Sequence, residues 1–139
     1  MSGITEDFLQ SPAIDFGVIP VSPVFSAAQQ IQTVNPHAAT NYVNAMYQYI
    51  GGVNVQLTAT VGDISVEIYD GNAPGGLLAY SAKFTFTGVG ETLSDRLGED
   101  YVPCYNSAGI WVHVSGSVAA MQCVVTPYML SGNVIPRLP

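Results

Sequence analysis

The sequence predicts an all-β protein, a two-sheet antiparallel β-sandwich that is jelly-roll-like and carries an extended N-terminal arm. Three observations predict this fold. Apolar and polar residues alternate with a period of two from about residue 43 to 130, which is typical of half-buried strands. Turn-forming residues separate the alternating runs, and prolines gather in the flanks. One sheet could not bury so many apolar faces, so we expect two layers.

The chain of 139 residues is long enough for one domain. We expect an extended proline-rich arm over residues 1–36, the β-sandwich domain over 37–130 and a C-terminal tail over 131–139. Within the arm, residues 15–25 read DFGVIPVSPVF and have no period that a helix or a long strand could use. Their large apolar side chains must be covered, and we expect a neighbouring molecule to cover them.

The arm continues into residues 25–34, FSAAQQIQTV, which form the best helix candidate of the chain. Thr33, Val34 and the nearby Pro36 disfavour a helix, so we expect two turns at most or an extended strand. Residues 91–101, ETLSDRLGEDY, concentrate charge, and we expect a solvent-facing loop with one helical turn beginning at Ser94.

The central strands follow from the alternation, which assigns one side chain in two to the core. The expected core residues are, run by run, Val53, Val55, Leu57 and Ala59; Ile64, Val66 and Ile68; Leu78, Tyr80, Ala82, Phe84 and Phe86; Ile110, Val112 and Val114; and Met121, Cys123 and Val125.

Charge is sparse: 9% of the residues are charged, against about 25% in ordinary soluble domains, and the net charge is −7. Such a surface favours association and suits a protein fixed in an assembly. Lys83, Arg96 and Arg137 are the three basic residues, too few to follow a phosphate backbone, so we expect no nucleic acid and no membrane as partner. The N-terminus lacks the pattern of a secretory signal, and no stretch is long and apolar enough to span a bilayer.

No set of residues indicates catalysis, and we predict no catalytic, cofactor-binding or metal-binding residue and no cofactor. His37 and His113 are the two histidines, and no Gly-x-Ser-x-Gly motif occurs. We expect His37 in a turn and His113 on an outer sheet face or an interface. Cys104 and Cys123 form no CxxC motif and indicate neither a disulfide framework nor zinc, although one disulfide between them stays open.

Asp63, Glu67 and Asp70 could converge on a calcium ion, but the spacing lacks the DxDxDG pattern and Asp70-Gly71-Asn72 is a turn signal. We therefore assign these carboxylates to a strand and its turns. Trp111 lies on the face opposite Val112 and Val114, where an aromatic ring could stack on a sugar. We favour its packing in a second core or a subunit interface, because large aromatic residues dominate both.

The stretches GDISVEIYDG, GGLLAYS and AGIWVHVSG, over residues 62–116, resemble the small β-sandwich modules appended to secreted bacterial peptidases. In such modules a strand ends in Tyr-Asp, a turn and Leu-Leu follow, and a later strand ends in Val-Ser-Gly. The resemblance implies a sandwich fold. The N-terminus does not show the signal-peptide pattern that accompanies such modules, and we expect no attached catalytic domain.

The layout of the whole chain resembles the cement or decoration proteins of tailed-bacteriophage capsids. The shared features are a short sandwich, a proline-rich apolar arm, few charges, an acidic balance and no catalytic set. Such proteins are commonly trimers seated where major capsid subunits meet. The likeness is one of layout, so no site residue is transferred from it.

These observations lead to a hypothesis of a non-enzymatic capsid cement protein, made in the host cytoplasm and located on the virion surface. Its expected partners are the major capsid protein and further copies of itself in a homotrimer. The residues expected at the interfaces are Phe8, Phe16, Val18, Ile19, Val24, Phe25, Trp111, Ile135 and Leu138. The alternatives are a carbohydrate- or receptor-binding module of a phage tail or fibre, or another minor virion structural protein. A small enzyme is the least favoured interpretation.

Overall fold

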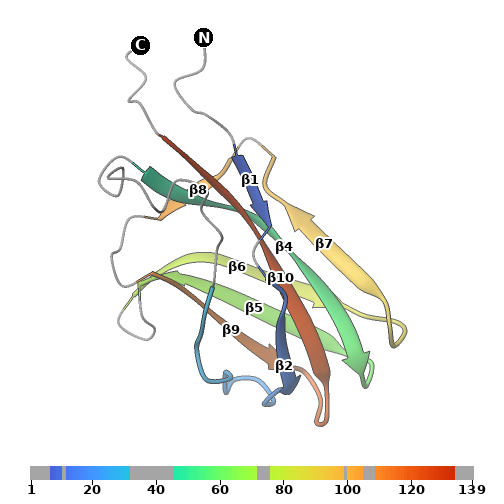
Figure 1. The fold of residues 1–139 in the computed structure, drawn as a ribbon. Helices are drawn as coiled ribbons and strands as arrows, with labels where there is room; N and C mark the ends of the chain where they lie inside the picture. The colour runs from blue at the N-terminus through green and yellow to red at the C-terminus, as the bar shows by residue number, and fades with distance from the viewer. Residues whose placement is uncertain are drawn as a thin grey trace.

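The computed structural model describes residues 7–10, 12–31, 46–71, 76–98, 100–104 and 109–133. These residues form β-strands and turns, and the strands make two antiparallel sheets packed face to face (Figure 1). The predicted β-sandwich is therefore confirmed. Among the described residues no helix is long and apolar enough to cross a membrane.

The first sheet has six strands, which we call the six-stranded sheet. Its members are β1 (Asp7–Gln10), β2 (Ile14–Val18), β4 (Met46–Ala59), β7 (Thr92–Arg96), β8 (Val102–Cys104) and β10 (Gln122–Asn133). The long strands β10 and β4 form its centre. Strands β1 and β2 pair with the outer side of β10, and β7 and β8 pair with the outer side of β4.

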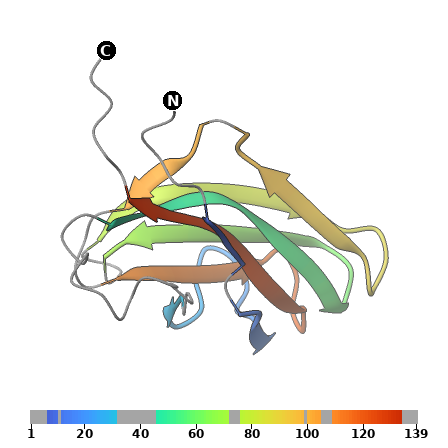
Figure 2. The same ribbon diagram turned by 45° about the horizontal axis from the view of Figure 1, so that its top comes forward.

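The second sheet has four strands in the order β3-β9-β5-β6. They are β3 (Gln29–Gln30), β5 (Asp63–Asp70), β6 (Leu77–Thr85) and β9 (Ile110–Gly116). The chain changes sheet between β4 and β5, returns between β6 and β7, and changes again before and after β9 (Figure 2). Repeated crossing between two layers is the jelly-roll-like arrangement that the sequence predicted.

The core lies between the sheets and is made by the alternating apolar residues. Inward residues of β4, β5, β9 and β10, together with Met121 just before β10, are buried as predicted: Val53, Val55, Leu57, Ile64, Val66, Ile68, Ile110, Val112, Val114, Met121, Cys123 and Val125. Tyr80, Phe84 and Phe86 contribute the aromatic part of the same core. Period-two alternation therefore identified the buried face of each of these strands.

Leu78 is a predicted core residue that the structure places outside, with 51% of its surface exposed. The pairing of β5 with β6 shifts register after Ile68, so that Ile68 lies opposite Tyr80 but Tyr69 lies opposite Leu78. Tyr69 points away from the core, and residues paired across a sheet share a face. The register shift therefore moves Leu78 to the outer face, which alternation alone does not reveal.

Residues 92–96 form strand β7 rather than the predicted loop with a helical turn at Ser94. The strand pairs with residues 52–56 of β4. Leu93 packs partly against the core, and Tyr80 on β6 donates a hydrogen bond to Asp95 at 2.6 Å. Pairing with the open edge of β4 outweighs the charges of this segment, because an unpaired central strand would leave its backbone groups unsatisfied.

Gly52 lets β7 approach β4 closely. Its φ is +138°, and a Cβ atom at this position would lie 1.9 Å from the carbonyl oxygen of Asp95. No other residue fits that space, and few others adopt that backbone conformation. The Gly51-Gly52 pair, which the sequence marks as a turn, is in fact an irregular point inside the long strand β4.

The N-terminal segment covers its own sandwich, contrary to the expectation that a neighbour covers it. After β2, residues 20–31 run along the outer edge of β9. Ser22 N–H donates to the Gly116 carbonyl at 2.8 Å, Ser26 N–H donates to Val114 at 2.9 Å and Ile31 N–H donates to Ile110 at 2.8 Å. Residues 25–31 therefore form extended chain and the short β3 rather than a helix; residues 32–34 lie outside the described part.

Two isoleucines anchor this segment in the core. Ile19 is 2% exposed and its N–H donates to the Met121 carbonyl at 2.9 Å, while Ile31 is 6% exposed. The segment can cover the sandwich because the extended pieces on either side of Pro20 and Pro23 place these two side chains inward. The division of the chain at residues 36 and 130 stays a prediction, since residues 32–45 and 134–139 are outside the described part.

We expect Ile19→Ala to lower the free energy of unfolding by about 2–4 kcal/mol, because it leaves a cavity in the core. Val18→Ala is the matched control: Val18 is the neighbouring residue and is 66% exposed, so its loss should cost under about 1 kcal/mol. Urea unfolding followed by circular dichroism measures both. Equal effects of the two substitutions would contradict docking of residues 12–31 on their own sandwich.

Candidate assembly surface

One end of the sandwich consists of four segments without a charged residue. They are residues 18–24 and the turns at 59–62, 86–90 and 116–120. The turns follow β4, β6 and β9 and gather at the lower right of Figure 1. The segments carry exposed valines, between 41% and 66% exposed: Val18, Val21, Val24, Val61, Val89 and Val118. We call this the valine end.

The turns of the valine end are held to one another by hydrogen bonds. Thr60 Oγ1 donates to the Ala120 carbonyl at 3.0 Å, which ties the turn after β4 to the turn after β9. Phe86 N–H donates to the Gly62 carbonyl at 3.0 Å, which ties the turn after β6 to the turn after β4. Exposed apolar side chains on such a fixed frame can be buried by a partner without a large cost in chain ordering.

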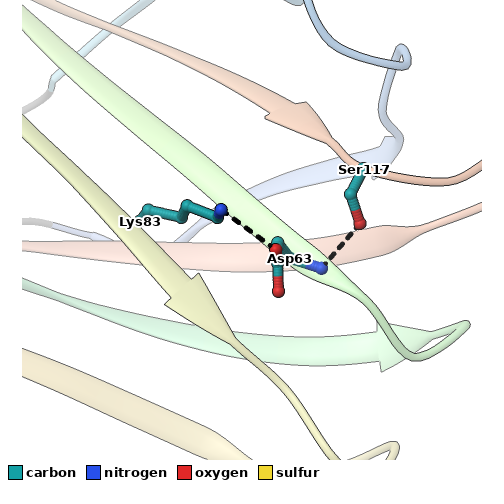
Figure 3. A network of polar contacts seen from close by, with 3 residues as sticks. All are labelled: Asp63, Lys83 and Ser117. Atoms are coloured by element: carbon teal, nitrogen blue, oxygen red, sulfur yellow. Dashed lines mark hydrogen bonds and ion pairs between the residues drawn. The ribbon is translucent and has the colours of Figure 1, made fainter.

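A small polar network borders the valine end (Figure 3). Ser117 Oγ accepts a hydrogen bond from Asp63 N–H at 2.8 Å, and Lys83 Nζ lies 3.2 Å from Asp63 Oδ2. Hydrogen bonds from Thr85 and Lys83 lower the pKa of the Asp63 carboxyl. The Asp63 carboxylate at this margin is thus paired with a positive charge, and the second carboxylate at the margin, Glu91, accepts a hydrogen bond from Thr87 N–H at 3.1 Å.

Clusters of exposed apolar side chains mark association sites, and the centres of protein interfaces are poor in charge. The valine end meets both conditions. The sequence-based interface set includes Val18 and Val24 but misses the other four valines: the sequence pattern assigns Val61 and Val89 to turns and Val118 to the start of the last strand, and it does not single out Val21 within the arm. The signal was present in Val61-Gly62, Gly88-Val89-Gly90 and Ser117-Val118, where a valine stands at the tip of a turn that needs no apolar residue.

The structure distributes the predicted interface residues of the arm over several environments. Val18 and Val24 are exposed at the valine end. Phe16 is partly buried against the core, and Phe8 lies on β1 opposite Leu130. Ile19 belongs to this chain's own core, so it is left out of the proposed interface.

Trp111 is half-buried on β9 and lines a hollow beside the N-terminal segment. The hollow lies away from the valine end, so the structure does not bring Trp111 together with the exposed valines. Ile135 and Leu138, the predicted contacts of the C-terminal tail, lie outside the described residues.

His113 helps to fasten the N-terminal segment to the four-stranded sheet. Its Nδ1 lies 2.6 Å from the Ser26 carbonyl oxygen, and its ring meets the rings of Phe25 at 6.1 Å and Tyr69 at 5.6 Å edge-on. Val114 N–H donates to Ser26 Oγ at 3.1 Å beside it. The predicted place on an outer sheet face is confirmed. His37 is outside the described residues.

The carboxylates considered for calcium do not form a cluster. Asp63 is paired with Lys83, and Glu67 accepts a hydrogen bond from the Tyr69 hydroxyl at 3.0 Å. In the described ranges, no three histidine, cysteine, aspartate or glutamate side chains are grouped to hold a metal ion.

Cys104 and Cys123 are free thiols, and both are buried. Burial raises the pKa of each thiol to about 12, and the negative charges of Asp70 near Cys104 and Asp15 near Cys123 act in the same direction. A thiol must lose its proton to act as a nucleophile, so these environments oppose catalysis by either cysteine.

No protein-family model matches the chain, and a search of curated proteins gives no match. Among solved structures, a chain from the X-ray structure of tomato aspermy virus has a TM-score of 0.47 at 11% identity and covers 100% of this chain and 84% of its own. A chain from Bacillus endospore appendages, described as a novel family of disulfide-linked pili, has a TM-score of 0.43 at 12% identity, with 97% and 96% covered.

A chain from maize chlorotic mottle virus, determined by single-particle analysis, has a TM-score of 0.31 at 13% identity and covers 98% of this chain and 96% of its own. These are distant likenesses of backbone arrangement, so function is inferred from the chain's own residues. The sandwich implied by both sequence resemblances is the observed fold, and the two families themselves stay predictions.

The two buried thiols should make the protein less stable in alkali. In the unfolded chain a thiol ionises near pH 9, whereas in the folded protein its pKa is about 12. Between these values unfolding releases protons, so the free energy of unfolding falls as pH rises above 9 and is unaffected well below it. We expect the two thiols together to lower the free energy of unfolding by about 2 kcal/mol between pH 9 and 10.

Urea unfolding under reducing conditions at pH 8, 9 and 10 measures this slope. The variant with Cys104→Ala and Cys123→Ala, less stable at every pH, should show a clearly shallower fall than the wild type. Equal slopes would mean that the thiols are accessible in the folded protein.

Proposed function

We propose that this chain is a structural virion protein, a capsid cement or decoration protein that stabilises a shell by binding between major capsid subunits. The valine end carries the proposal. A protein with a net charge of −7 keeps four neighbouring segments at one end of its sandwich free of charged residues and presents valines there on turns that are hydrogen-bonded to one another. An end of this kind is suited to permanent contact with another protein.

The mechanism is burial of apolar surface. A valine side chain that is half exposed contributes on the order of 1 kcal/mol when a partner covers it, before the cost of association. One copy would therefore bind weakly. A homotrimer seated on a repeating lattice would engage several such surfaces at once, and the effective concentration of the second and third contacts strengthens the whole attachment.

The N-terminal segment has a different role from the bridging arm that the sequence suggested. Residues 12–31 hold their own sandwich together through Ile19, Ile31 and the contacts of Ser26 with His113. They contribute to attachment through Val18, Val21 and Val24, which the segment adds to the valine end.

The proposal includes a non-enzymatic role without a cofactor, a location on the virion surface and synthesis in the host cytoplasm. The buried cysteines and the engagement of His113 with the N-terminal segment favour it. The small number of basic residues argues against nucleic acid or a membrane as partner. Another minor virion structural role is the nearest alternative, because it would use the same surface.

The decisive experiment is cosedimentation of the purified protein with empty shells of the virus that encodes it. Val89→Asp and Val118→Asp should each weaken binding at least tenfold, because a carboxylate would be buried in an apolar contact. Leu77→Asp is the matched control: Leu77 is 77% exposed on β6 at the opposite end of the sandwich, and its substitution should leave binding unchanged.

Mass photometry of the free protein tests the expected trimer in the same samples. A wild-type protein that does not sediment with shells would refute the cement role. Equal weakening by Leu77→Asp would refute the assignment of the valine end as the contact surface.

A further inference from the structure

A hollow of about 520 Å³ opens between the two limbs of the N-terminal segment. Residues 12–15, where β2 begins, form one wall, and residues 28–30, around β3, form the other, with Trp111 completing the lining. The volume lies within the range of small-molecule sites in proteins, about 300–1,000 Å³. The hollow is separate from the valine end, so a ligand could bind in it whether or not the protein attaches to a capsid.

The walls are fixed in place by the two sheets. Asp15 pairs with Val124 on β10, whereas Gln30 pairs with Trp111 on β9. The carboxylate of Asp15 is oriented as well, because its Oδ1 accepts a hydrogen bond from Gly17 N–H at 2.9 Å. A ligand entering this space would meet walls that are already ordered, which lowers the entropy cost of binding.

The lining combines apolar surface with groups that recognise hydroxyls. Pro12, Ile14 and the indole of Trp111 are apolar or aromatic residues of the hollow. The primary amides of Gln29 and Gln30 can each donate and accept hydrogen bonds, and the carboxylate of Asp15 accepts them. A ligand made only of hydrocarbon would displace water from these polar groups without replacing its hydrogen bonds, and this loss would weaken binding.

The charge of the lining further restricts the class of ligand that could bind. Among the described residues that line it, Asp15 is the one charged side chain, and none is a lysine, arginine or histidine. Phosphates, sulfated sugars and sialic acids would meet a negative charge with nothing to balance it. What remains is a neutral molecule with an apolar face and a rim of hydroxyls, which is the chemistry of a pyranose ring.

We propose that the hollow lined by Trp111 binds a neutral oligosaccharide. The indole provides aromatic surface for a sugar ring, and Asp15, Gln29 and Gln30 bind hydroxyls along its rim. The site holds one to three sugar units. A virion protein with such a site would attach weakly to neutral glycans, and many copies on one particle would turn weak sites into firm attachment.

The experiment uses Trp111 as its own reporter, because it is the single tryptophan of the chain. The full-length protein is titrated with maltotriose, cellotriose, xylotriose and chitotriose, with sialyllactose as the charged control, while tryptophan emission is recorded. We expect a saturable change with at least one neutral trisaccharide and none with sialyllactose. A glycan array of neutral sugars extends the panel.

Gln30→Ala should weaken the response at least tenfold, since it removes an amide from the lining of the hollow. Gln56→Ala is the matched control, because Gln56 is an exposed glutamine on β4 in the other sheet and should leave the titration unchanged. Circular dichroism and thermal unfolding verify that each variant is folded. The proposal is overturned if no neutral sugar changes the emission or binds on the array, or if both glutamine variants respond as the wild type does.

Discussion

A sandwich of two open sheets has to cover the backbone groups at its sheet edges. The rest of this structure depends on how the N-terminal segment covers the edges formed by β10 and β9. The N-terminal segment pairs with β10 in one sheet through β1 and β2, then crosses to follow β9 in the other. Unpaired edges invite pairing with other chains. Covering both edges with one segment brings Ile19 and Ile31 into the core and leaves the hollow beside Trp111 between the two limbs.

This arrangement separates two tasks of the N-terminal segment, backbone pairing and contact with partners. The hydrogen-bonding capacity of the N-terminal segment is used within the molecule, by Gly116, Val114 and Ile110 of β9. What is left for partners is side-chain surface, and it is unevenly distributed: exposed apolar residues cluster where three turns and residues 18–24 meet. The proposed attachment through that end would rely on apolar burial and would need no added strand, so it would leave the sheets intact.

Alternation predicted most of the fold because a half-buried strand leaves a direct record in its sequence. It identified Val53, Val66 and Val112 as core residues without any knowledge of pairing. It failed where pairing decides the outcome: the register shift that exposes Leu78, and the β4 edge that draws residues 92–96 into a strand. The position of Trp111 on an outer sheet face could be predicted. The hollow beside it could not, because its other walls come from segments about 80 to 100 residues earlier in the sequence.

Gly52 has a consequence for tracing the ancestry of this fold. The carbonyl of Asp95 occupies the space that any side chain at position 52 would need. A homologue with another residue at this position would have to separate two paired strands. We therefore expect Gly52 to be retained even where one hydrophobic core residue replaces another. Distant homologues should therefore share a glycine within a long alternating strand and a short charged strand about forty residues later. This pattern is a better search criterion than overall sequence identity.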